Sequence, residues 1–156
     1  HTLQIDEFTF RCCIGKKGST KNKKEGDKKT PKGTFEIENL YFRGDRKQKP
    51  ATSLKCIEIK KYMGWCDDIH FPKKYNKLFK IKNNIKHEKL KRRDYKYNLL
   101  IPIKYNFKKP IVEKGSCIFI HLTKNYRPTA GCIALKEKDF LIMLKLIKKN
   151  SKIKIF

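Results

Sequence analysis

Strict alternation of apolar and polar residues marks the end of the chain. Ile153 and Ile155 fall on one side of residues 152–156, and Lys152 and Lys154 fall on the other. This period of two is typical of a β-strand with one buried face. Alternating or apolar runs predict further strands at 8–14, 34–38, 55–61, 99–103 and 117–121. The pattern therefore predicts a mainly β fold.

One segment near the C-terminus has helical spacing instead. Residues 137–149 predict an amphipathic helix with lysines near its C-terminal end, where positive charge suits the helix dipole. Its apolar stripe, which we expect to pack on the core, contains Phe140, Leu141, Leu144 and Ile147. The polar segment 71–97 predicts irregular structure or short helices, and residues 15–33 predict a charged loop that contains glycine.

Length and charge limit the classes of protein to consider. A chain of 156 residues, 38% of them hydrophobic, suits one core, so we expect a single domain over residues 1–156. Lys and Arg number 40 against 15 Asp and Glu, which gives a net charge of +25 and suggests an anionic partner. The lysines are spread from Lys16 to Lys154 and form no basic helix or tail, so we do not expect nucleic acid as the partner.

The cysteines and the apolar runs bear on metals and membranes. The six cysteines form no C-x-x-C pair, so zinc-ribbon and zinc-finger spacing is absent and we expect no metal. A zinc site built from Cys66, His70, His121 and Cys132 is the open alternative. We also expect no cofactor. No run approaches the roughly 18 to 20 apolar residues that cross a bilayer, so we expect no membrane span. The chain begins with His1 and not Met, and we expect any export signal upstream of it. Nothing in the sequence indicates an oligomeric state.

The candidate chemistry lies near the C-terminal end. His121 ends an apolar strand, and after a short polar loop Cys132 follows Gly131. A free thiol ionises near pH ~8.5, so a nucleophilic cysteine needs a base or a positive charge nearby. Gly131 lets a carbonyl substrate approach the backbone, where the amides of Gly131 and Cys132 can face an oxyanion. The residues alone equally allow Cys132 as a small core residue and His121 as a structural strand histidine.

Four sequence blocks, in this order, carry a resemblance to a known family. Residues 26–35 read Gly-Asp-Lys-Lys-Thr-Pro-Lys-Gly-Thr-Phe, and residues 65–68 read Trp-Cys-Asp-Asp. Residues 115–121 read Gly-Ser-Cys-Ile-Phe-Ile-His, and residues 129–132 read Thr-Ala-Gly-Cys. Together they resemble the YkuD-type (ErfK/YbiS-like) L,D-transpeptidases, from about residue 8 to residue 156. The resemblance implies one β-rich, sandwich-like catalytic domain.

The resemblance also implies a reaction and its site. Cys132 would be the nucleophile, His121 the general base, and the backbone carbonyl of Leu122 the group that orients the imidazole. The substrate would be a peptidoglycan stem peptide, which loses a terminal D-alanine to form an acyl-enzyme on Cys132. An amine would then complete transfer, or water would complete an L,D-carboxypeptidase reaction. The implied location is the periplasm or cell envelope. A non-enzymatic basic module that binds nucleic acid or the cell wall remains the alternative.

Two departures from the family bear on substrate binding. The best-known members carry His-Gly before the cysteine and an arginine two residues after it, where this chain has Ala130-Gly131 and Ala134. A guanidinium suits a substrate carboxylate because it can donate two hydrogen bonds to it. The expected substrate-binding residues are Thr129, Arg92, Arg93, Tyr75 and Trp65, with Arg127 as a further candidate. The alternatives are ordinary surface charges for the arginines and core packing for the two aromatic rings.

Overall fold

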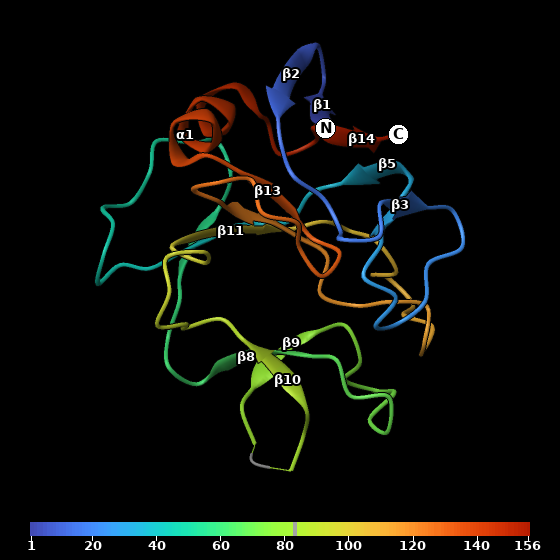
Figure 1. The fold of residues 1–156 in the computed structure, drawn as a ribbon. Coiled ribbons are helices and arrows are strands. Elements are labelled where there is room, and N and C mark those ends of the chain that lie inside the picture. The colour runs from blue at the N-terminus through green and yellow to red at the C-terminus, as the bar shows by residue number, and fades with distance from the viewer. Residues whose placement is uncertain (83) are drawn as a thin grey trace.

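A four-stranded antiparallel sheet pairs the two ends of the chain in the computed structural model, which describes residues 1–82 and 84–156 (Figure 1). Its strand order is β2-β1-β14-β5. The strands are β1 (Thr2–Ile5), β2 (Phe8–Arg11), β5 (Gly33–Glu36) and β14 (Lys152–Ile155). Alternate residues of β1 and β14 are buried, namely Leu3, Ile5, Ile153 and Ile155. The period-two pattern at the C-terminus therefore faces the core as predicted.

A five-stranded sheet forms the centre of the molecule, in the order β13-β12-β11-β6-β7. Its strands are β6 (Leu40–Phe42), β7 (Cys56–Glu58), β11 (Leu99–Pro102), β12 (Phe119–Leu122) and β13 (Ile133–Leu135). The β12–β13 and β6–β7 pairs are parallel, and the other pairs are antiparallel. One face shares the main hydrophobic core with the four-stranded sheet and with helix α1 (Glu137–Leu146), which buries Phe140, Met143 and Leu144.

The other face of this sheet is also buried. A three-stranded sheet, in the order β10-β8-β9, covers this face. Its backbone is separated from the other strands in Figure 1, and side chains of a second core lie between them. Its strands are β8 (Met63–Cys66), β9 (Leu78–Lys80) and β10 (His87–Lys89). Tyr41, Leu100 and Phe119 of the five-stranded sheet join Trp65 in this second core. Burial on both faces explains why β11 and β12 read as continuous apolar runs.

The structure confirms the mainly β class, since β-structure holds 34% of the residues and α1 only 6%. The predicted strands are present but shorter, and the predicted helix ends at Leu146 because Ile147 is extended, with ψ 147°. Segment 71–97 contains β9 and β10, and among its described residues no helix forms. Strands β1, β6, β8 and β13 were not predicted. The loop over 15–33 contains two short paired strands, β3 (Ser19–Thr20) and β4 (Thr30–Pro31).

No helix within the described part of the chain is long and apolar enough to pass through a bilayer.

Candidate active site

Strand β12 positions His121. Its side chains alternate between the two faces of the sheet, so Phe119 and His121 share the face of the second core. His121 is buried, with its ring edge-on to Tyr97 at 5.4 Å between centroids. Its Nδ1 lies 3.0 Å from the backbone carbonyl oxygen of Leu122. Because a carbonyl only accepts, Nδ1 carries the proton and Nε2 is left with its lone pair, as a general base requires.

The parallel pairing of β12 and β13 brings Cys132 beside this strand. Ile120 pairs with Ile133 and His121 with Ala134, so Cys132 lies just before the start of β13. Cys132 and His121 line one cavity of about 780 Å³. The thiol of Cys132 donates a hydrogen bond to the backbone carbonyl of Cys117, with Sγ 3.2 Å from the oxygen. The thiol is therefore protonated and held on a carbonyl in this structure.

Burial keeps both groups neutral near pH 7. It raises the pKa of the Cys132 thiol to about 12 and lowers the pKa of His121 to about 4. The bond from His121 to the Leu122 carbonyl opposes the shift at the imidazole, but burial dominates. The resting pair is thus a thiol and a neutral imidazole, and not a thiolate with an imidazolium.

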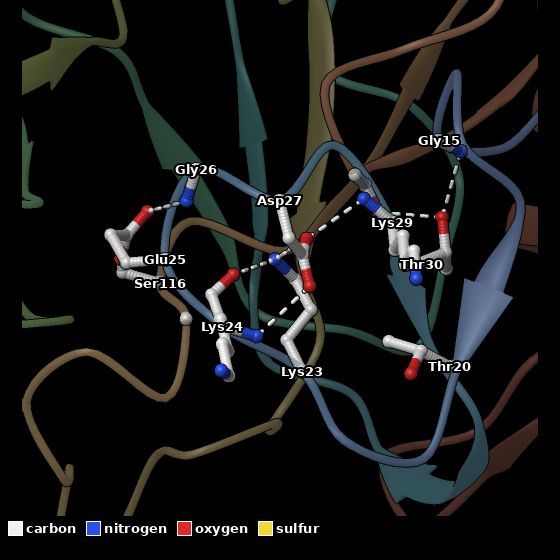
Figure 2. A network of polar contacts seen from close by, with 12 residues as sticks. Gly15, Thr20, Lys23, Lys24, Glu25, Gly26, Asp27, Lys29, Thr30 and Ser116 are labelled. Atoms are coloured by element: carbon white, nitrogen blue, oxygen red, sulfur yellow. Dashed lines mark hydrogen bonds and ion pairs between the residues drawn. The ribbon is translucent and has the colours of Figure 1, made fainter.

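A buried threonine holds the loop that carries Cys132. The hydroxyl of Thr30 donates to the carbonyl of Gly131 at 2.8 Å and accepts from the amide of Gly15 at 2.9 Å. Figure 2 shows the Gly15–Thr30 contact at the edge of the 23–30 loop. Gly131 has φ +145°, and a Cβ there would lie 3.0 Å from the Lys29 carbonyl. Glycine is therefore required at 131 for its conformation and for close packing on this loop.

Hydrogen bonds within the 129–132 turn already engage its polar groups. The amide of Gly131 donates to Thr129 Oγ1 at 3.1 Å, and the Thr129 hydroxyl donates to the Cys132 carbonyl at 2.6 Å. All three residues line the cavity. The expected oxyanion donor at Gly131 thus has an internal partner in this structure, as does the Thr129 side chain.

The three candidate arginines differ in position. Arg92 and Arg127 line the cavity, whereas Arg93 is exposed on the surface outside it. The Arg92 guanidinium lies 2.7 Å from both Glu88 and Asp94. Its hydrogen bonds hold the pKa of the Asp94 carboxyl below its ordinary value. Arg93 therefore does not share the cavity of Cys132 and His121, and its contact with substrate stays a prediction.

Trp65 and Tyr75 are buried side chains. Trp65 is 3% exposed and packs edge-on against Phe119 at 5.3 Å between ring centroids. Tyr75 is fully buried, and its hydroxyl bonds to the carboxylate of Glu25. Both rings belong to the protein interior and lie outside the lining of the cavity, as the core-packing alternative predicts.

The 23–27 segment forms part of the cavity wall that the sequence reasoning did not identify (Figure 2). Lys23 is buried and pairs with Asp27 at 2.6 Å. Burial alone would raise the pKa of Asp27, but bonds from Lys23 and from two backbone amides lower it overall. Glu25 accepts from Ser116 at 2.7 Å. The available signal was Asp27, inside the block that resembles the family.

The cysteines are free thiols in this structure. Within residues 1–82 and 84–156, no three side chains of the His, Cys, Asp or Glu types are grouped as a metal site. Cys66 is buried in β8, and His70 is exposed in the following turn.

Comparison with known proteins gives one match. The family described as YkuD, the L,D-transpeptidase catalytic domain, matches residues 4–155. No curated protein and no solved structure matches the chain significantly.

Proposed function

Because the chain belongs to the YkuD family of L,D-transpeptidase catalytic domains, we propose that it transfers acyl groups from peptidoglycan stem peptides through a thioester on Cys132. The family indicates an L,D-transpeptidase-type enzyme that acts on peptidoglycan. The observation that carries the proposal is the shared cavity, into which Cys132 and a His121 with an available Nε2 both open. A peptidoglycan substrate also supports a location outside the cytoplasm, in the periplasm or cell envelope.

In the proposed first step, His121 Nε2 takes the proton of the Cys132 thiol while Sγ attacks the carbonyl carbon of the scissile peptide bond. The neutral resting pair favours proton transfer during the attack over a preformed ion pair. Collapse of the tetrahedral intermediate breaks the C–N bond. The imidazolium returns its proton to the leaving amine of D-alanine, which leaves a thioester.

The second step reverses these roles. His121 removes a proton from the attacking amine or water, and the Cys132 thiolate leaves and is reprotonated. An amine gives a cross-link, and water gives a trimmed stem. The amides of Cys132 and Gly131 are the proposed oxyanion donors. Gly131 would exchange its bond to Thr129 for one to the oxyanion when the substrate enters.

Arg92 and Arg127 are the proposed partners of substrate carboxylates, because both line the cavity. They would supply the positive charge that the best-known family members place two residues after the cysteine, where this chain has a buried Ala134. The net charge of +25 adds a long-range attraction for anionic stem peptides.

Intact-mass spectrometry with a purified tetrapeptide muropeptide tests the proposal. We expect loss of D-alanine and a transient acyl adduct with the wild type, and neither with Cys132→Ala. Cys117→Ala is the matched control, because it removes a thiol from the same cavity without removing the proposed nucleophile. Dimeric products would indicate cross-linking, and free tripeptide would indicate trimming. Turnover that persists in Cys132→Ala would refute the proposal.

A further inference from the structure

Asn76 uses its whole side-chain amide in the protein interior. It is 4% exposed and follows Tyr75 in the turn after β8, with φ +54°. Its Oδ1 accepts from the indole N–H of Trp65 at 2.9 Å and from the backbone N–H of Cys117 at 3.1 Å. Its Nδ2 donates to the carbonyls of Tyr105 and Asn106 at 3.1 and 2.7 Å. Two accepted and two donated bonds satisfy the amide.

These four partners determine the orientation of the amide. A flipped Asn76 would present N–H groups to the donors of Trp65 and Cys117 and an oxygen to two carbonyl oxygens. The side chain therefore joins β8, the 105–106 turn and Cys117 in one arrangement only. Its backbone amide adds a bond to the Cys66 carbonyl at 2.8 Å. Such a fully bonded buried amide rigidifies the segments that it connects.

Cys117 links Asn76 to the candidate nucleophile. Its backbone has φ +54°, a left-handed conformation that is uncommon for residues other than glycine. Its N–H is held by Asn76, and its carbonyl accepts the thiol proton of Cys132 at 3.2 Å. The Cys117 N–H donates to Asn76, and this bond therefore stabilises the backbone conformation that places the Cys117 carbonyl against the sulfur of Cys132.

We propose that Asn76 is a positioning residue for the Cys132 thiol, acting through the peptide of Cys117. The inference rests on the proposed role of Cys132 as the nucleophile. A carbonyl oxygen stabilises a thiol that donates to it and repels a thiolate, so the Cys117 carbonyl keeps the sulfur protonated and oriented. Asn76 thus holds the thiol in its resting position until the substrate and His121 displace the proton.

Alkylation of Cys132 by iodoacetamide, followed across pH by residue-resolved mass spectrometry, tests this role without any peptidoglycan substrate. The variant is Asn76→Gly, because glycine adopts φ +54° without strain and has no side-chain amide. We expect alkylation of Cys132 to be about 2- to 10-fold faster at a fixed pH, from loss of one net hydrogen bond to the neutral thiol. The pH profile should move to lower pH by up to about one unit.

Two controls separate positioning from general loosening of the fold. Cys12 is buried in the main core and reports unfolding, so its alkylation should stay at the wild-type rate in Asn76→Gly. Asn98→Ala removes another buried asparagine side chain, 7% exposed, which accepts from Arg46. It should leave the Cys132 profile unchanged. A wild-type Cys132 profile in Asn76→Gly, or equal acceleration at Cys12, would overturn the proposal.

A second measurement serves if Asn76→Gly does not fold. In the wild-type protein, alkylation of Cys132 removes the S–H donor, so NMR shifts of the Cys117 amide and the Asn76 side-chain amide should both change. Unchanged Asn76 resonances would refute the coupling. A shifted thiol profile in a protein that releases no D-alanine would uphold the positioning role and refute only the proposed function.

Discussion

Replacing Thr30 by valine removes one hydroxyl and nearly preserves the side-chain volume. Thr30 is fully buried, and its hydroxyl satisfies two backbone groups, the carbonyl of Gly131 at 2.8 Å and the amide of Gly15 at 2.9 Å. Valine leaves both without this partner. Each buried polar group that loses its partner costs about 1–3 kcal/mol, so Thr30→Val should lower the free energy of unfolding by about 2–6 kcal/mol. That is a large part of the stability of an ordinary domain.

Urea denaturation measures this loss. With an m value of about 2 kcal/mol/M, the midpoint should fall by about 1–3 M. Thr20→Val is the matched control from the same loop, since the Thr20 hydroxyl is only half-buried and accepts from the amide of Asn22 at 3.1 Å. It should cost well under 1 kcal/mol. If Thr30→Val loses no more than Thr20→Val, the hydroxyl does not secure the Gly131 loop and the reasoning fails.

Three further predictions concern the cavity and its surroundings. Arg92→Ala should raise KM for a tetrapeptide stem about tenfold through loss of a charged hydrogen bond, while Arg93→Ala should leave steady-state kinetics unchanged; equal effects would contradict the assignment. The pKa of His121 is lowered to about 4, so between about pH 4 and 6.5 the unfolded chain binds a proton there that the folded protein does not. The free energy of unfolding should therefore decrease as the pH is lowered from about 6.5 to about 4. Urea titrations at several pH values should show that the free energy of unfolding depends less on pH in His121→Gln than in the wild type. An unchanged pH dependence would refute the buried neutral imidazole. Trp65→Phe should lower the free energy of unfolding by about 1–3 kcal/mol, from the lost indole bond, yet leave KM for the same peptide unaltered; a large rise in KM would return this ring to the substrate site.

Local pattern predicted the strand that carries His121, because the mainly apolar run 117–121 is typical of a strand that is buried on both faces. The same reasoning missed β13, since Ile133–Leu135 is short and is defined by its parallel partner. Strand β8 was missed for a similar reason, because only its neighbours β9 and β10 reveal it. Short strands therefore depend on pairings that no local window contains.

The candidate site shows the same limit. The placement of His121 and Cys132 near each other followed from ordered sequence blocks and not from periodicity. The burial of Trp65 could not be predicted, because an aromatic residue in a polar segment suits a groove and a core equally well. No sequence signal pairs the Thr30 hydroxyl with the Gly131 carbonyl, since the two residues are far apart in the chain and meet only after folding.

The parallel pairing of β12 and β13 restricts how this protein can change in length. Residues 123–132 connect the two strands, and the register sets Ile120 against Ile133. If a change in length shifted this pairing by one position, every side chain of β13 would change face. Cys132 would then point into the main core and Ile133 into the cavity. Length changes that reach the paired residues should therefore disrupt the site, whereas the exposed tip of the connection, residues 124–125, can absorb an added residue.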